Sequence, residues 1–315
     1  MSWLSPIGWA QQLRPFAGER WWVLGVAAAG WGLVGSIGFV LAGRRDLGAG
    51  LLPTRPGPAR AGALLRTPLA LAWRLQRATL LAWAAGLSVY GAAIGGVADS
   101  ITDLVEGSRG TRDLITKLGG QKALIDAFLA TAMGILGLVA AIYSVQAVLR
   151  LRAEESALRA EPILATPVGR IQWALSHVVF AVVGSAVVLV AAGLAAGLTH
   201  GLRAHDLGRQ VPRVIGGALV QLPAVWAIAA VAVVLFGFAP RLVLASWGVL
   251  GVCLLLGQLG PVLELPQWLM DVSPFTHVPR VPGSPVSTTP LVVLTLVAGL
   301  LGLFGLLGFR RRDIG

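Results

Sequence analysis

Long apolar runs that are nearly free of charged residues alternate along this chain with short polar segments. Seven such runs lie at 23–42, 78–98, 127–149, 173–198, 214–236, 242–257 and 291–309. Most of them reach the ~20 residues that an α-helix needs to cross a hydrocarbon core about 30 Å thick. The pattern therefore predicts an all-α, polytopic membrane protein with about seven transmembrane helices. The run 242–257 is short for a span.

Small residues cluster inside three of these runs. The stretches are "GAAIGG" at 91–96, "GILGLVAA" at 134–141 and "AAGLAAG" at 191–197. Small side chains let two helix backbones approach closely in lipid. We therefore expect these stretches to lie at helix–helix contacts.

The distribution of charge predicts how the chain is oriented in the cell (plasma) membrane. Only 12% of the 315 residues are charged, yet the net charge is +11. In a soluble protein such an excess would suggest nucleic acid, whereas here it indicates membrane orientation, and no nucleic-acid partner is expected. A cytoplasmic C-terminus and an external N-terminus agree with the rule that Arg and Lys concentrate inside. The cytoplasmic segments, which carry a net charge of +10 against +1 outside, are then 43–77, 150–172, 237–241 and 310–315.

The two ends of the chain resemble each other. A Ser-Pro pair, an apolar run and the sequence "GRRDLG" close near residue 48, and a second Ser-Pro, an apolar run and "RRRDIG" close the chain. Pro6 lies 40 residues before Asp46, and Pro274 lies 39 residues before Asp313. Each charged cluster could be only a stop-transfer signal, but the matched spacing favours a duplication.

The duplication predicts that this chain holds the tail of one unit and all of the next. The two Ser-Pro sites are 268 residues apart, so two full units would need about 536 residues. We expect about 220 further residues with roughly five spans, upstream of Met1 or in a neighbouring gene. Residues 1–50 would then be an external segment with the last helix and the RRD end of a first repeat.

The rest of the chain divides into a linker and a six-helix unit. Residues 51–77 are a Pro-rich cytoplasmic linker followed by a segment, "RTPLALAWRLQR", that is either an amphipathic helix on the membrane surface or the start of the next span. Residues 78–315 form the six-helix transmembrane unit. Two longer polar segments of this unit, 99–126 and 259–290, are expected outside, and an apolar piece of the second re-enters the outer leaflet.

The segment 150–172 is the most informative cytoplasmic loop. Its charges alternate in sign, and Pro162 and the Thr166-Pro167 pair interrupt any long helix. A short charged helix between two spans is suited to docking a soluble partner. The alternative is an ordinary positively charged inside loop.

Several stretches resemble a known family. The succession "RAEESALRAEPILATPVGR", a "SPF-H-P" external segment and the closing "GFRRRD" are similar to ABC-2 type permeases of bacterial ABC exporters. The similarity is greatest to the actinobacterial branch that exports polyketide antibiotics. The opening of this chain, "SWLSPIGWAQQLRPFAGERWW", and the later stretches "RRDLGAGLLPTRPGPAR" and "LAWRLQR" also match that branch. Members of that branch carry two six-helix halves in one chain.

The resemblance implies an ATP-driven exporter of lipophilic compounds such as antibiotics or drugs. In such families the loop between the second and third helices of a half couples the permease to a dimer of ATP-binding subunits. Carried over to this chain, the coupling residues are Glu154, Glu155, Arg159, Glu161, Thr166, Pro167 and Arg170. The resemblance implies three partners: the dimer of ATP-binding subunits, a first-half permease segment or a second permease copy, and the lipid bilayer.

The chain lacks the residues for ATP binding. A P-loop needs Gly-Lys-Ser/Thr, but the only lysines, Lys117 and Lys122, follow Thr and Gln. ATP and Mg²⁺ would therefore bind the partner subunit, and no catalytic, cofactor-binding or metal-binding residue is expected here.

Three other classes of membrane protein remain as alternatives. A secondary carrier usually needs an acid in mid-membrane, and the predicted spans hold none in their middle. A membrane enzyme would need clustered His, Asp or Glu; His200, His205 and Asp206 fit a solvated loop better than a zinc site. A non-transporting membrane anchor is the third alternative.

Overall fold

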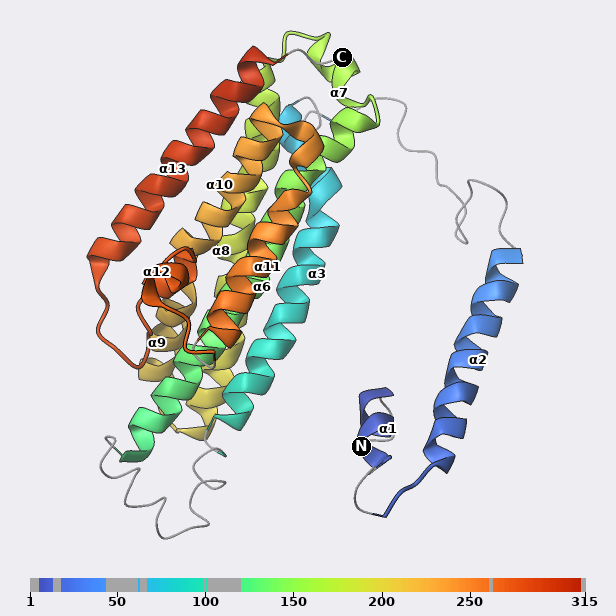
Figure 1. Ribbon diagram of the computed structural model, residues 1–315, viewed down its shortest axis with the longest axis vertical. Helices are drawn as coiled ribbons and strands as arrows, with labels where there is room; N and C mark the ends of the chain where they lie inside the picture. Colours follow the sequence, from blue (N-terminus) through green and yellow to red (C-terminus); the bar gives the residue numbers. More distant parts are fainter. Residues whose placement is uncertain are drawn as a thin grey trace. The chain divides into compact units, whose positions relative to one another are not determined.

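A computed structural model describes residues 6–13, 18–43, 62, 67–98, 100, 120–260 and 263–312. The chain divides into two compact units, Met1–Ala61 and Gly62–Gly315 (Figure 1). All regular structure of the described residues is helical, as the apolar pattern predicts. Residues 44–46, the first RRD stretch, and most of 99–119 lie outside the described residues.

The first unit contains a short helix, α1 (Pro6–Gln12), and a long one, α2 (Trp22–Gly43). The two helices touch where Trp9 meets Gly30, whose missing side chain leaves room for the indole ring. Of the residues in α2, only Val23 is buried. A 22-residue helix that is apolar on every side is suited to lipid contact.

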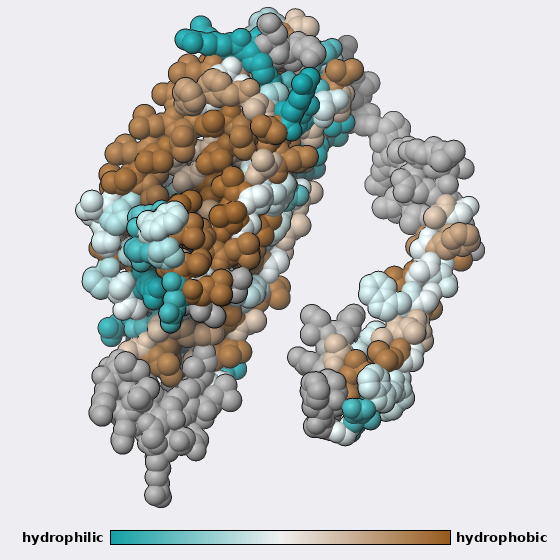
Figure 2. All heavy atoms as spheres, in the orientation of Figure 1, coloured by the Kyte–Doolittle hydropathy of each residue, from teal (hydrophilic) through white to brown (hydrophobic). Residues whose placement is uncertain are grey.

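The second unit is a bundle built around α6 (Gly120–Ser156), α8 (Arg170–Arg203) and α10 (Leu222–Phe238). One flank is α3 (Pro68–Val97), which packs along α8, and the other is α13 (Thr288–Arg311), which packs along α10. The largest fully buried side chains include Trp173, Tyr143, Phe236 and Phe309. In Figure 2, hydrophobic residues cover the middle of the visible face of this bundle.

Six described helical segments are long and apolar enough to cross a membrane: 22–43, 68–97, 122–156, 170–203, 207–238 and 288–311. They match six of the seven predicted spans, and the chain is a polytopic helical membrane protein. The seventh prediction, 242–257, corresponds to a shorter helix, α11 (Ala245–Leu259). Its 15 residues rise about 22 Å, less than the ~30 Å core.

Two predicted segments have a different internal structure from the simplest expectation. Residues 68–77 are the first turns of α3, so the "RTPLALAWRLQR" segment starts the span and is not a separate surface helix. The predicted span 214–236 consists of α9 (Leu207–Leu219) and α10, separated at Val220–Gln221 just before Pro223.

The segment 259–290 is folded against the bundle. It contains the short helices α12 (Gln267–Met270) and η4 (Pro274–His277), which contact α11, and η4 also contacts α10 and α13. Near the other end of this segment, the carbonyl of Pro282 accepts a hydrogen bond from Arg213 of α9 at 3.1 Å. Arg213 also bonds the carboxylate of Asp126 at 2.6 Å. Figure 1 places α12 beside the end of α13 opposite to its C-terminus.

Candidate functional site

The segment 150–172, here called the α7 segment, forms one end of the bundle, which we call the α7 end. Its first part continues α6 to Ser156, its middle is the five-residue helix α7 (Ala160–Leu164), and its last part begins α8 at Arg170. The C-terminal end of α13 and the start of α3 lie at the same end (Figure 1). A short helix between two spans is therefore present, as the pattern of charge and proline predicts.

The turn between α6 and α7 is a helix-capping motif. The backbone amide of Leu158 donates to the carbonyl of Glu155 at 3.0 Å. The backbone amide of Arg159 donates to the carbonyl of Glu154, also at 3.0 Å. Leu158 has a φ of 55°, in the left-handed region that this Schellman geometry requires. Since glycine usually occupies this position, a leucine that is 64% exposed there stands out as an apolar side chain on the surface.

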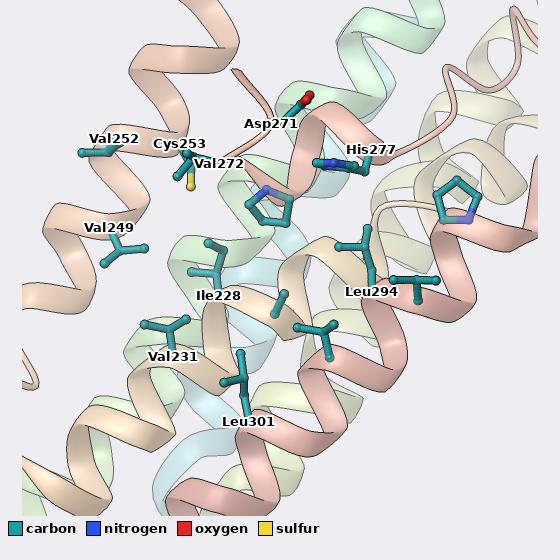
Figure 3. Close-up of a pocket in the computed structure, with 15 residues that line it drawn as sticks. Ile228, Val231, Val249, Val252, Cys253, Asp271, Val272, His277, Leu294 and Leu301 are labelled. Atoms are coloured by element: carbon teal, nitrogen blue, oxygen red, sulfur yellow. The ribbon is translucent and has the colours of Figure 1, made fainter. Parts of the chain in front are cut away.

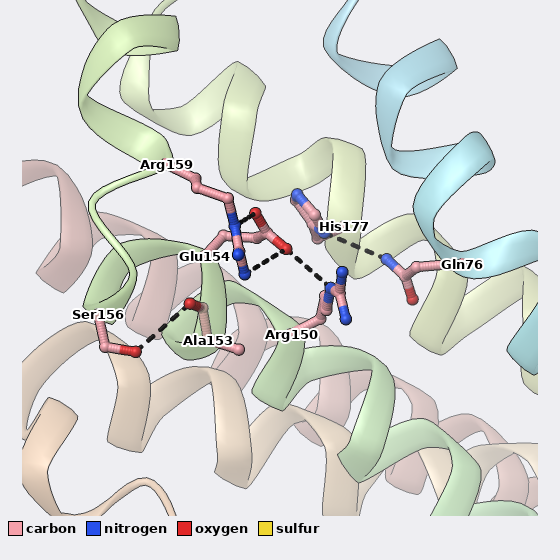
Figure 4. Close-up of polar contacts among 7 residues, drawn as sticks. All are labelled: Gln76, Arg150, Ala153, Glu154, Ser156, Arg159 and His177. Atoms are coloured by element: carbon pink, nitrogen blue, oxygen red, sulfur yellow. Dashed lines mark hydrogen bonds and ion pairs between the residues drawn. The ribbon is translucent and has the colours of Figure 1, made fainter. Parts of the chain in front are cut away.

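Glu154 is the centre of a buried ion-pair network that supports this turn. It is 6% exposed, and its carboxylate forms an ion pair with Arg150 at 2.9 Å and accepts a hydrogen bond from Arg159 at 2.7 Å (Figure 4). The network joins the last turns of α6 to the residue that precedes α7. Because a buried charge must be paired to be tolerated, Glu154 fixes the position of α7 and is not available to a partner.

Glu155 belongs to a second network that reaches the end of α13. It pairs with Arg152 at 3.5 Å and, more closely, with Arg312. Arg312 also donates to the carbonyl of Phe236 at 2.7 Å, and its guanidinium lies 5.0 Å from the Phe236 ring and 5.3 Å from the Phe309 ring. Its side chain is 16% exposed, so the charge is mostly enclosed.

Arg170 completes the connection between the segments. Its guanidinium donates to the backbone carbonyl of Arg312 at 2.6 Å. Glu155 and Arg170, near the two ends of this segment, are thus both bonded to Arg312, the residue that follows α13. From the sequence, Arg312 was expected only to belong to a cluster of positive charges on the cytoplasmic side. The Arg-Arg-Asp stretch that contains it occurs twice in the chain, and this recurrence is a signal that could have pointed to its role.

The remaining predicted coupling residues face outward. Arg159, Glu161, Thr166, Pro167 and Arg170 are exposed. The Thr166 hydroxyl donates to the carbonyl of Ile163 at 2.6 Å and so closes the turn after α7. Glu161 bonds to no other described side chain, which leaves its carboxylate available at the surface. The seven predicted residues therefore divide into a support, in which Glu154 is buried and Glu155 is mostly enclosed, and an exposed surface.

A polar pair is buried behind this support. His177 is 3% exposed, and its Nδ1 lies 3.2 Å from Nε2 of Gln76 on α3. Its ring lies 5.6 Å from that of Trp173, which lies 5.8 Å from Phe309. Figure 4 shows His177 and Gln76 facing each other beside the Glu154 network. The pair joins α3 to α8 at the α7 end.

The loop with His200, His205 and Asp206 has a structural role in the described part of the chain. Asp206 is the N-cap of α9 and accepts from the amide of Arg209 at 3.3 Å. His200 is buried on α8. Among the described residues, no group of three or more His, Cys, Asp or Glu side chains could hold a metal ion.

An apolar cavity of about 550 Å³ opens between α10, α11, α13 and the residues 271–277. Ile228 and Val231 of α10 and Leu294 and Leu301 of α13 line it, and Asp271 is a polar group at one end (Figure 3). Pockets of this size and apolar character are typical of small-molecule sites. The sequence could not reveal this cavity, because its walls come from segments far apart along the chain.

Comparison with known proteins places the chain in a family. Residues 65–310 match the family described as the multidrug efflux system permease Rv1217c, C-terminal domain. The multidrug efflux system permease protein Rv1217c of Mycobacterium tuberculosis (strain ATCC 25618 / H37Rv) is 45% identical over 314 residues, which are 100% of this chain and 57% of that protein. The chain thus spans a little over half the length of this relative. It belongs to the family of the C-terminal domain of the multidrug efflux system permease Rv1217c.

Proposed function

We propose that this chain is the membrane-spanning permease part of an ATP-driven exporter of the ABC-2 type, in the branch that exports polyketide antibiotics. The observation that carries the proposal is the α7 segment, a short charged helix held on two ion-pair networks at one end of the bundle. The name of the relative, a multidrug efflux system permease, supports export of drugs. The apolar cavity beside α13 suits a lipophilic cargo.

In this mechanism a dimer of ATP-binding subunits, carrying ATP and Mg²⁺, docks on the exposed face of α7. Closure of the dimer pushes the α7 segment, and the Glu155–Arg312 and Arg170–Arg312 contacts carry the motion to α13 and α10. Packed helices transmit such displacements because they shift between discrete arrangements. The second half of the pathway comes from a first-half permease segment or from a second copy of this chain.

The docking proposal is tested with Glu161→Arg. The reversed charge opposes the field of a partner that is complementary to the exposed carboxylate. We expect about tenfold less ATP-binding subunit to co-purify, on the order of 1.4 kcal/mol, with membrane insertion unchanged. Glu264→Arg, the same reversal at an exposed site outside the α7 segment, is the control and should retain the partner. Normal recruitment by Glu161→Arg would refute docking through α7.

The proposed orientation puts the α7 end in the cytoplasm and Ser287 outside. Ser287 precedes α13 and Arg312 follows it, so a helix of 24 residues, about 36 Å long, separates them. In a Cys253→Ser background, Ser287→Cys should react with an impermeant thiol reagent added to intact cells, and Ala165→Cys should react only after the cells are opened. The reverse labelling pattern would invert the topology.

A further inference from the structure

Two cavities flank the contact between α3 and α8 near the α7 end. One has a volume of about 1020 Å³ and the other about 460 Å³. Both include Thr67, Leu69 and Val179, so the two cavities meet at the first turn of α3. Together they form a groove, here called the α3–α8 groove, with two limbs that start from one place.

The walls of the larger limb are hydrocarbon along most of its length. Leu80, Leu81 and Ala84 of α3 face Phe180, Val183 and Val187 of α8. From Arg74 to Ala84 the helix rises about 15 Å, which is half of a hydrocarbon core about 30 Å thick. The limb therefore has the depth of one leaflet.

The groove becomes basic toward the start of α3. Arg74 and Arg77 line the larger limb, and because they are three residues apart they lie on the same face of α3. Both are exposed, and neither pairs with an acid among the described residues. Neither α3 nor α8 contains an Asp or a Glu. The two positive charges thus border an apolar groove without a counter-charge on its walls.

An aromatic residue lies next to the two arginines on α3. Trp73 is 47% exposed and stacks on Phe180 with 6.1 Å between ring centroids. Tryptophan prefers the level of the lipid headgroups, where one side of the ring is apolar and the other is wet. Its position agrees with Arg74 and Arg77 lying at headgroup depth.

We propose that the α3–α8 groove binds an anionic phospholipid from the leaflet on the α7 side. Its phosphate contacts Arg74 and Arg77, whose guanidinium groups match phosphate oxygens in geometry and charge. Its two acyl chains lie in the two limbs. A free phosphate would leave the apolar limbs unused, and a zwitterionic phospholipid would bring a headgroup cation close to the two arginines, which like charges disfavour. The site is distinct from the α7 docking surface and does not depend on it.

The experiment is native mass spectrometry on the whole chain, purified in detergent and titrated with phosphatidylglycerol or with phosphatidylcholine of the same acyl composition. The wild type should retain phosphatidylglycerol in preference to phosphatidylcholine. The double variant Arg74→Gln/Arg77→Gln should bind phosphatidylglycerol roughly tenfold more weakly and lose the preference. Arg241→Gln, which removes an exposed arginine at the same end but outside the groove, should behave as the wild type.

A second variant tests the apolar limb without changing charge. Val183 is 54% exposed, so Val183→Trp can fill the limb without disturbing the helix contact. This variant should bind both lipids more weakly, while its thermal unfolding midpoint stays that of the wild type. Equal binding of the two lipids by the wild type, or undiminished phosphatidylglycerol binding by the double variant, would overturn the proposal. The proposal would also be overturned if Leu81→Cys formed disulfide-linked dimers in membranes and the purified protein retained no phosphatidylglycerol. The groove would then be a contact with a second copy of the chain.

Discussion

Replacing Gly95 by leucine is expected to separate α3 from α8 and to destabilise the bundle more than any single exposed substitution. A Cβ at Gly95 would overlap the carbonyl oxygen of Ala196 and the hydroxyl of Thr199. The carbonyl belongs to the backbone of a long helix and cannot turn aside, so the helices must move apart. One turn earlier, Gly91 meets the backbone of Ala192 in the same way.

The size of this effect follows from the packing of α3. Its closest neighbour along its whole length is α8, and contacts with α6 are few. Overpacking a tight contact costs about 1–3 kcal/mol, and a backbone collision should reach the upper part of that range. The thermal unfolding midpoint in detergent, measured by near-UV circular dichroism, should fall by several degrees.

The neighbouring glycine provides a matched control for this prediction. Gly96 is on the same turn of α3, and a Cβ there would meet nothing within 4 Å. Gly96→Leu adds the same side chain toward open space and should leave the midpoint unchanged. If both variants unfolded at the same temperature, the close α3–α8 contact would not be a source of stability.

This contact illustrates what could be predicted from the sequence. The stretches 91–96 and 191–197 were expected at helix contacts because small residues recur in them, and the structure confirms this for both. The pairing itself was not predictable, because the residues that meet, such as Gly95 and Ala196, lie 101 residues apart in the chain. Of the stretch 134–141, Gly137 packs against Gln221, whereas Gly134 faces open space.

The α7 segment shows the same limit for charged residues. Alternating charge and two prolines predicted a short helix between two spans, and α7 is present. The pattern could not separate Glu154 and Glu155, which support the segment, from Glu161, which is exposed. Burial of a carboxylate depends on which arginines the fold brings near it. For Glu155 the decisive arginine, Arg312, lies 157 residues further along the chain.

The shortest apolar run, 242–257, forms a helix that is shorter than the predicted span. Charge-free composition over 242–257 fits a span, but the helix there runs only from Ala245 to Leu259. Composition reports that a segment prefers an apolar environment, whereas crossing the membrane needs about 20 residues of helix. The segment 259–290, folded back against α11, continues where the helix ends.

Removing the side chain of Arg312 is expected to release the α7 segment from the bundle. Arg312→Gln loses the pair with Glu155, the bond to the carbonyl of Phe236 and the stacking on two aromatic rings. Glu155 keeps only Arg152, at 3.5 Å. Leaving one partner of a largely buried pair uncompensated costs about 3–5 kcal/mol, and the value should be near the lower limit because Arg152 remains.

Hydrogen–deuterium exchange of the segment 150–172 measures this release directly. Amide exchange there should accelerate in Arg312→Gln, while exchange in the middle of α8 should stay slow because that part of the core is intact. Arg310 and Arg311 are exposed neighbours of the same residue type, so Arg310→Gln and Arg311→Gln should exchange as the wild type. Arg312→Lys should be intermediate, since lysine keeps the charge but not the planar fork.

The same variants test what the Arg-Arg-Asp stretch at residues 311–313 does. If its purpose were only to hold the helix end at the membrane surface, the three arginines would be interchangeable and all three glutamine variants would behave alike. Such a result would reduce the cluster to an inside-positive signal. A selective effect at Arg312 would instead show that the residue before Asp313 bonds the last helix to the α7 segment.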